Sequence, residues 1–426
     1  MELLGELLSR SNLIRAYNQV VRNRGGAGTD RMQVQELKTY LQKHWGEIRL
    51  EIEKGVYLPK PVRGIEIPKR SGGKRLLGIP TVMDRMIQQA VHQVLSPLWE
   101  PEFSNHSYGF RPGRNAQQAV QQAQTYINEG YQIIIDIDLQ NFFDVVNQDY
   151  LMSLLYRTVS DRMVLKLIRK YPQAGILVGS QIQERKTGTP QGSPLSPLLS
   201  NILLNELDKE LGRRGLRFVR YADDCSIYLN SKRAAWRVKR SITKFIEAKL
   251  KLKVNQKKTG IRRPVSFKLL GYAFVSTFKK GEYGKYNLRV NPTRFDHLKD
   301  RIRQITRKTS PMTFDERIGE LNSLTRGWVN YFKLATMWGK LHELDGWIRN
   351  RLRYCIWKQW KRPNRRRRAF IQLGVDPGHA FAWAYCRHSG WRIAQSPIMG
   401  TTITLDRLKQ RGYISFEETN SKVGYV

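Results

Sequence analysis

The sequence predicts an α+β fold, because strand and helix patterns are both present up to about residue 290 and helical patterns follow. Residues 131–138 contain an isoleucine-rich core, which is typical of a strand buried in a sheet. Two apolar segments flank a short polar centre in residues 218–228, which indicates a β-hairpin. From about Asn291, apolar residues instead recur at helical spacing among many basic residues.

The turn of the 218–228 hairpin carries adjacent carboxylates, Asp223 and Asp224. Two unit charges ~4 Å apart repel by about 4 kcal/mol at an effective dielectric constant near 20, so a divalent cation would stabilise the pair. A solvated acidic turn would explain the same residues without a cation. The buried strand that ends at Asp138 favours the cation: if these three carboxylates meet, they form a two-metal site for in-line nucleotidyl transfer.

Basic residues are in large excess over acidic ones. The 426 residues include 74 Lys and Arg against 36 Asp and Glu, a net charge of +38 at pH 7. This excess predicts a polyanionic partner. Because 40% of the residues are hydrophobic, the chain can form buried cores, so we expect the charged residues on the surface of globular domains. The length suggests two or three domains.

Cysteine content and hydropathy predict the compartment. Cys225, Cys355 and Cys386 are widely spaced and support neither a disulfide framework nor a Cys-based zinc site, which fits a reducing cytoplasm. No apolar run approaches the ~20 residues of a membrane span, and the N-terminus lacks the apolar core of a signal peptide. We therefore expect a cytoplasmic protein with no membrane partner.

A second hairpin is predicted around Ser71-Gly72-Gly73, between two strand-like segments. Facing a carboxylate-metal site, cations at its tip would suit a nucleotide triphosphate, although a solvated hairpin carries similar charges. The cations near the tip are Lys69, Arg70, Lys74 and Arg75.

Two polar loops and one basic block are further candidates for ligand contact. Residues 108–114 carry Arg111 and Arg114, which suit either phosphate contacts or a rigid turn. Residues 188–197 hold Gln191 ahead of a strong helix start, unless the loop is a plain connector. A like-charge block repels itself unless phosphates neutralise it, the alternative being a solvated helix end. The block is Arg365, Arg366, Arg367 and Arg368.

The order of several short motifs resembles that of reverse transcriptases. These motifs are Asp138-Leu-Gln-Asn-Phe-Phe-Asp144, Thr189-Pro-Gln-Gly192, Tyr221-Ala-Asp-Asp224, the stretch from Asn255 to Lys258, and Leu270-Gly-Tyr272. Arg326-Gly-Trp-Val-Asn-Tyr-Phe332 looks like the maturase signature, also called X or thumb. Over nearly its whole length the chain resembles group II intron-encoded reverse transcriptase-maturases, especially compact bacterial ones of the group IIC kind.

The resemblance implies a right-hand polymerase fold in three parts. Residues 1–290 would form the fingers and palm with an N-terminal extension, 291–370 a helical thumb or maturase domain, and 371–426 a small DNA-binding segment. Such a protein is an RNA-directed DNA polymerase that binds its intron RNA, assists splicing and supports retrohoming. Its partners would be intron RNA, an RNA template with a DNA primer, a DNA target and deoxynucleoside triphosphates.

The resemblance also implies roles for individual residues. Asp138, Asp223 and Asp224 would bind two Mg²⁺ ions, and Lys258 would donate a proton to the departing pyrophosphate. Phe143 matches the steric gate that excludes a ribose 2′-hydroxyl. The remaining nucleotide-binding positions are Lys69, Arg75 and Gln191.

Two positions depart from the family pattern. Arg31 stands where the family commonly has Gly, which leaves the conformation of the N-terminal loop open, and Gln148 stands where it commonly has His. Because no Cys/His-rich endonuclease domain follows the tail, the resemblance implies that any mobility uses a primer made elsewhere.

Three other functions compete with this one. A splicing cofactor without polymerase activity would not need the three acids, and an RNA-making polymerase would be expected to lack Phe143. A host-adopted relative in DNA repair or phage defence would keep the same site, so the sequence does not separate it from a maturase.

Overall fold

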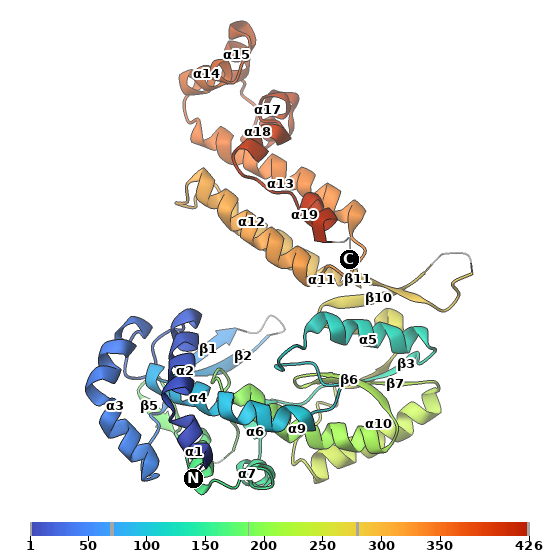
Figure 1. The fold of residues 1–426 in the computed structure, drawn as a ribbon. Coiled ribbons are helices and arrows are strands. Elements are labelled where there is room, and N and C mark those ends of the chain that lie inside the picture. The colour runs from blue at the N-terminus through green and yellow to red at the C-terminus, as the bar shows by residue number, and fades with distance from the viewer. Residues whose placement is uncertain (1, 69–71, 186, 278–280, 424–426) are drawn as a thin grey trace. The chain divides into compact units, whose positions relative to one another are not determined.

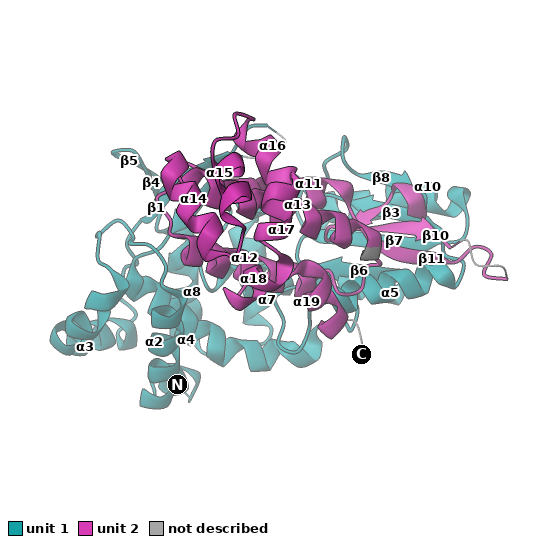
Figure 2. Cartoon of the chain, turned by 90° about the horizontal axis from the view of Figure 1, so that it is seen from above, with its two compact units in different colours: residues 1–263 teal, residues 264–426 magenta. Residues whose placement is uncertain are grey.

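The computed structural model describes residues 2–68, 72–185, 187–277 and 281–423. It divides into two compact units, residues 1–263 and residues 264–426 (Figure 2). Both units contain helices and strands, which confirms the predicted α+β class. None of the described helices combines the length and apolarity that crossing a membrane requires.

The first unit contains two sheets and the helices that pack on them. Its elements in chain order are α1 (Glu2–Leu7), α2 (Arg10–Asn23), η1 (Val34–Glu36), α3 (Leu37–Glu53), β1 (Val62–Pro68), β2 (Lys74–Ile79), α4 (Val82–Trp99), η2 (Glu100–Glu102), α5 (Ala116–Asn128), β3 (Ile133–Ile137), α6 (Phe142–Val145), α7 (Gln148–Tyr156), α8 (Arg162–Gln173), β4 (Ile176–Val178), β5 (Gln181–Gln183), α9 (Ser196–Arg213), β6 (Arg217–Tyr221), β7 (Asp224–Leu229), α10 (Lys232–Ala248) and β8 (Gly260–Arg262).

One four-stranded sheet has the order β6-β7-β3-β8, and all its neighbouring strands are antiparallel. The predicted buried strand is β3, whose Ile134 and Ile135 have no exposed surface. Helix α10 packs against β3, β7 and β8, and α5 packs against β6. These two helices lie on opposite sides of the sheet (Figure 1), which explains why β3 is apolar on both faces.

The other sheet has the order β2-β1-β4-β5. Strands β1 and β2 form the second predicted hairpin, with Pro68 paired to Lys74. Residues 69–71 of its tip, including the predicted triphosphate ligand Lys69, lie outside the described residues.

The second unit is a small sheet followed by helices. Its elements are η3 (Pro264–Ser266), β9 (Lys268–Leu269), β10 (Tyr272–Ser276), β11 (Tyr286–Val290), α11 (Pro292–Ile305), α12 (Phe314–Tyr331), α13 (Trp338–Gln359), α14 (Pro363–Gln372), α15 (Pro377–Ala384), α16 (Gly390–Gln395), α17 (Pro397–Thr402), α18 (Leu405–Gln410) and α19 (Phe416–Val423). Thr313 and Glu316, in the pattern Thr-x-x-Glu, form a capping box that opens α12.

Aromatic contacts explain why the compact units divide between residues 263 and 264, ahead of the predicted boundary at 290. The Tyr272 and Phe332 rings lie 5.2 Å apart, and the Tyr331 hydroxyl donates to the carbonyl of Leu270 at 2.9 Å. Gly271 has φ 86°, and a Cβ there would lie 3.3 Å from the Phe332 ring. The 270–272 motif and the 326–332 motif, far apart in the sequence, thus contact each other and join β10 to α12. The functional division into 1–290, 291–370 and 371–426 stays a prediction.

Arg31 adopts the backbone conformation that Gly favours. Its φ is 58°, and its N–H donates to the carbonyl of Gly28 at 3.4 Å. Residues with a Cβ avoid this left-handed region because the Cβ crowds the following carbonyl oxygen, at ~1–2 kcal/mol. The loop therefore keeps a Gly-type conformation although this chain has Arg there.

We expect Arg31→Gly to raise the free energy of unfolding by up to about 1 kcal/mol, because the relief of strain exceeds the added chain entropy of Gly. Arg22→Gly, inside α2, is the matched control and should lower it by about 1 kcal/mol. Thermal unfolding of the two variants and the wild type measures both effects. Destabilisation of similar size in both variants would contradict strain at Arg31.

Candidate active site

A pocket of about 290 Å³ in the first unit brings together predicted site residues from five separate stretches of the chain. These residues are Arg75, Asp138, Phe143, Gln191, Asp223 and Lys258. Lys74, Asp144 and Asn255 also line the pocket. Carboxylates, cations and one aromatic ring thus face a common space.

Asp138 follows the central strand β3, and the 255–259 turn holds it. Its N–H donates to Oγ1 of Thr259 at 3.0 Å, and its carbonyl accepts the N–H of Asn255 at 2.8 Å. Nζ of Lys258 lies 3.5 Å from Oδ2 of Asp138. Because the Lys258 side chain is 63% exposed, it is free to turn from the carboxylate toward a ligand in the pocket.

Asp223 lies in the two-residue turn of the β6–β7 hairpin, which confirms the predicted hairpin. Tyr221 pairs with Asp224 across the turn, and Ala222 has φ 56°, in the left-handed region that tight hairpin turns use. Asp223 lines the pocket, whereas Asp224 begins β7 and is not among the lining residues.

The protein and the carboxylates around this turn raise the pKa of Asp224. Desolvation, followed by repulsion from Asp223, Asp136 and Asp138, raises the pKa of Asp224 to about 6. The Asp224 side chain keeps contact with solvent, so its desolvation comes from dense neighbouring protein and not from enclosure. A cation bound here would relieve the repulsion.

The donor set fits a hard divalent cation, although its side chains do not surround a common point. In the part of the chain that the structure describes, no group of three His, Cys, Asp or Glu side chains is arranged to hold a metal ion. Carboxylate oxygens are nevertheless the ligands that Mg²⁺ prefers. Asp138 and Asp223 supply them to one pocket. Desolvation first, and then repulsion from the neighbouring carboxylates, raises the pKa of Asp224 beside them.

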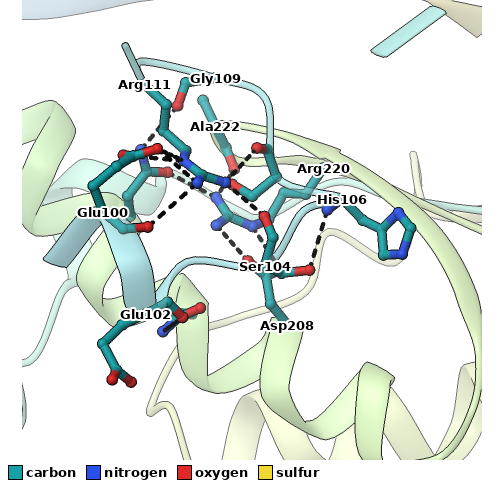
Figure 3. Close-up of polar contacts among 12 residues, drawn as sticks. Glu100, Glu102, Ser104, His106, Gly109, Arg111, Asp208, Arg220 and Ala222 are labelled. Atoms are coloured by element: carbon teal, nitrogen blue, oxygen red, sulfur yellow. Dashed lines mark hydrogen bonds and ion pairs between the residues drawn. The ribbon is translucent and has the colours of Figure 1, made fainter. Parts of the chain in front are cut away.

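A buried ion pair supports the hairpin from inside the protein. Arg220 in β6 and Asp208 in α9 have no exposed side-chain surface, and two hydrogen bonds of 2.7 and 2.6 Å join them (Figure 3). Arg220 also donates to Oδ1 of Asn201 at 2.9 Å and to the carbonyl of Ala222 at 3.0 Å. The last bond fixes the residue that precedes Asp223.

The 104–111 loop closes on the same turn. Nδ2 of Asn201 donates to the carbonyl of Gly109 at 2.8 Å, and the N–H of Tyr108 donates to the carbonyl of Arg220 at 2.9 Å. A Cβ at Gly109 would lie 2.4 Å from the backbone nitrogen of Ala222, so only Gly fits there. The turn is therefore enclosed between α9 and this loop.

The guanidinium of Arg111 makes its contacts inside the protein. Its guanidinium pairs with Glu100 at 2.7 Å and donates to the carbonyls of Ser104 and Ser107 at 2.6 and 2.9 Å (Figure 3). Because its side chain is only 4% exposed, these contacts support the rigid-turn interpretation and argue against a phosphate contact. Arg114 is half-buried, and its guanidinium donates to Oδ1 of Asn105 at 2.9 Å.

The loop that carries Gln191 is fastened to the segment that carries Phe143. The N–H of Thr189 donates to the carbonyl of Phe143 at 2.7 Å. Nε2 of Gln148, a buried residue, donates to the carbonyl of Gly188 at 3.0 Å. Gln148 thus positions this loop and, as expected, touches no proposed catalytic atom.

Sequence reasoning missed the support of the hairpin, namely Arg220, Asp208 and Asn201. The signal was a polar residue inside an apolar segment. Arg220 interrupts the strand before the acidic turn, and Asn201, Asn205 and Asp208 recur at helical spacing within the largely apolar α9. A buried polar stripe of this kind indicates a buried polar partner.

Helix α14 in the second unit carries the predicted arginine block, but not all of it is available to a ligand. Arg366 donates to the carbonyl of Trp360 at 2.9 Å, and its guanidinium lies 4.0 Å from the centre of the Trp357 ring. Arg366 therefore has a packing role. The exposed members are Arg365, Arg367 and Arg368.

We expect Arg220→Met to lower the free energy of unfolding by roughly 3–5 kcal/mol, because it leaves Asp208 charged, buried and unpaired. The double variant Arg220→Met/Asp208→Leu removes both charges and should recover most of this loss. Arg213→Met is the matched control, since it removes an exposed arginine on α9 whose partner Glu210 keeps its pair with Arg214, and it should change stability by less than about 1 kcal/mol. Urea denaturation measures the free energy of unfolding of each variant and of the wild type. A loss in Arg220→Met no larger than in the control would contradict the support we assign to the pair.

Comparisons with known families cover most of the chain. The description "Reverse transcriptase (RNA-dependent DNA polymerase)" matches residues 67–274, and "Group II intron, maturase-specific domain" matches residues 295–372. The first match contains every residue of the pocket, and the second contains α12, α13 and α14.

Individual relatives agree with these matches. Protein YkfC of Escherichia coli (strain K12) is 31% identical in an alignment of 277 positions that covers 56% of this chain and 72% of that protein. Group II intron-encoded protein LtrA of Lactococcus lactis subsp. cremoris is 29% identical over 419 residues, covering 77% of this chain and 69% of LtrA. The putative COX1/OXI3 intron 1 protein of Saccharomyces cerevisiae is 25% identical and covers 80% of this chain and 51% of its own length. The chain therefore belongs to the group II intron-encoded reverse transcriptases, which join an RNA-directed DNA polymerase domain to a maturase domain.

Proposed function

We propose that the pocket around Asp138 and Asp223 is the site of DNA synthesis, with Asp138, Asp223 and Asp224 as the ligands of two Mg²⁺ ions. The observation that carries this proposal is that Asp138 and Asp223, from separate motifs, line one pocket together with cations and an aromatic ring. When bound, the two ions would align the primer hydroxyl with the nucleotide triphosphate and neutralise the charge that develops.

The chain's own cations would bind the triphosphate and supply a proton. Arg75 is exposed on β2 and lines the pocket beside Lys74, which suits the charge of an incoming nucleotide. Lys69 is proposed for the same task on the resemblance alone. Lys258 would hold a proton at Nζ beside Asp138 and pass it to the pyrophosphate oxygen as the bond to phosphorus breaks.

Phe143 and Gln191 would select and position the nucleotide. The Phe143 ring packs edge-on against Phe142 at 5.1 Å, and the hydrogen bond from Thr189 holds its backbone. A ring restrained in this way would overlap a ribose 2′-hydroxyl, which favours deoxynucleotides. Gln191 lies in the same wall of the pocket.

Unit 2 would bind the intron RNA and the DNA target. The exposed arginines of α14 suit phosphates of folded RNA, and we assign DNA binding to residues 371–426. The end of this segment is held on α13: Asp345 is buried and accepts hydrogen bonds from the Tyr413 hydroxyl and the N–H groups of Phe416 and Glu417, at 2.9 to 3.1 Å. In this arrangement the chain would assist splicing and support retrohoming.

We expect Asp138→Asn and Asp223→Asn each to slow primer extension on an RNA template by more than about a hundredfold, because each loses several kcal/mol of transition-state stabilisation. RNA binding should persist. Asp149→Asn, which changes an exposed acid on α7, is the matched control and should extend normally. Wild-type rates in either active-site variant, measured with Mg²⁺ and each nucleotide set, would refute the site.

We expect Arg365→Gln/Arg367→Gln/Arg368→Gln to weaken binding of structured intron RNA and slow protein-assisted splicing. Each lost phosphate contact should reduce the log–log salt slope of binding by roughly 0.7 to 0.9. Extension on a short primed template should be retained. Arg366 is left in place because it packs on Trp357.

The variant with Lys at the same three positions keeps the charge and should keep RNA affinity. An equal loss of affinity in the Lys and Gln variants would show that charge is not what α14 contributes.

A further inference from the structure

Helix α10 in the first unit presents a large aromatic side chain to solvent. Trp236 is 63% exposed, although tryptophan is usually well buried. On the other face of the helix, Ala235, Ile242 and Ile246 have no exposed surface, and α10 packs there against the β6-β7-β3-β8 sheet. Trp236 is therefore not part of that core.

Cations run along the exposed face beside Trp236. Arg233, Arg237, Arg240 and Lys244 recur at positions i, i+4, i+7 and i+11, so they share one face, and all four are exposed. Glu247 is the single acidic residue of α10. The face is therefore strongly positive.

Trp236 borders an open hollow of about 530 Å³. The hollow is lined by Trp236, Arg237, Lys239, Arg240, Thr243 and Gln256, without an acidic residue. Nζ of Lys239 lies 5.5 Å from the centre of the Trp236 ring and 3.3 Å from the carbonyl of Thr259. This lysine holds the ring at the edge of the hollow and ties α10 to the 255–259 turn.

The same turn borders the active-site pocket. Asn255 and Lys258 line that pocket, and Gln256, between them, lines the hollow beside Trp236. A nucleic-acid strand that leaves the pocket across this turn therefore reaches α10 directly.

We propose that the α10 surface, formed by Arg233, Trp236, Arg237, Arg240 and Lys244, binds an unpaired segment of RNA. One base would stack on Trp236, and the cations would contact the adjoining phosphates. Unpaired nucleotides fit this surface because they expose both a flat base and phosphates, whereas a duplex buries its base faces. The choice of RNA rests on the proposed function, in which the template at the neighbouring pocket is RNA.

The test compares Trp236→Ala, Trp236→Phe and Tyr156→Ala. Tyr156 is 56% exposed and lies at the end of α7, so its loss is a matched control for removing an exposed aromatic. Fluorescence anisotropy measures the affinity of each folded variant for a short labelled single-stranded RNA at constant salt. Trp236→Ala should bind about five- to tenfold more weakly than the wild type, Trp236→Phe should keep most of the affinity, and Tyr156→Ala should be unchanged.

Two further probes examine the nature of the ligand. Photocrosslinking of RNA that contains 4-thiouridine should label the α10 peptide around Trp236. An RNA duplex of the same sequence should lose less affinity in Trp236→Ala than the single-stranded RNA does, because its base faces are buried. Equal losses with the duplex would overturn the unpaired ligand.

Failure of this proposal can be distinguished from failure of the polymerase site. Wild-type RNA affinity in Trp236→Ala, or crosslinks that miss α10, would overturn the α10 surface even where the wild-type protein extends a primer. Absence of extension by the wild-type protein would instead overturn the proposed active site, while the affinities would still decide about α10.

Discussion

The buried ion pair between Arg220 and Asp208 is the constraint on which the active-site pocket depends. Taking two charges out of water costs several kcal/mol per ion, so such a pair persists only where its remaining hydrogen bonds are satisfied. Here Arg220 also donates to Asn201 and to the carbonyl of Ala222. An apolar pair could fill the same space but could not hold that carbonyl, and this carbonyl sets the position of Asp223.

Hydrogen bonds to the main chain of Asp138 and Phe143 fix other parts of the pocket. The 255–259 turn holds the backbone of Asp138, and the Thr189 N–H holds that of Phe143. The reactive side chains themselves stay partly exposed, as Lys258 does. A rigid backbone with exposed functional groups is the arrangement that positions substrates without a large loss of entropy on binding.

The helical unit uses aromatic packing and one buried acid for a similar purpose. Tyr272 and Phe332 join the small sheet to α12, and Asp345 holds the beginning of α19 on α13. Burial raises the pKa of Asp345, and its three hydrogen bonds oppose that rise. Each unit also carries positive charge on an exposed helix face, unit 1 on α10 and unit 2 on α14, where a polyanion can reach it.

The sequence by itself determined the β6–β7 hairpin, the buried strand before Asp138 and the capping box at Thr313, because periodicity and turn chemistry are local properties. The order of its motifs also identified the family that the comparisons confirm. Only the tertiary structure decided that Arg111 is internal and that Arg366 packs on Trp357. It also decided that Arg220 has a buried partner and that Asp224 lies outside the pocket lining. The reason is that the sequence does not show whether a charged side chain faces solvent, a ligand or a carboxylate. Contacts between residues that are distant in the sequence determine its environment.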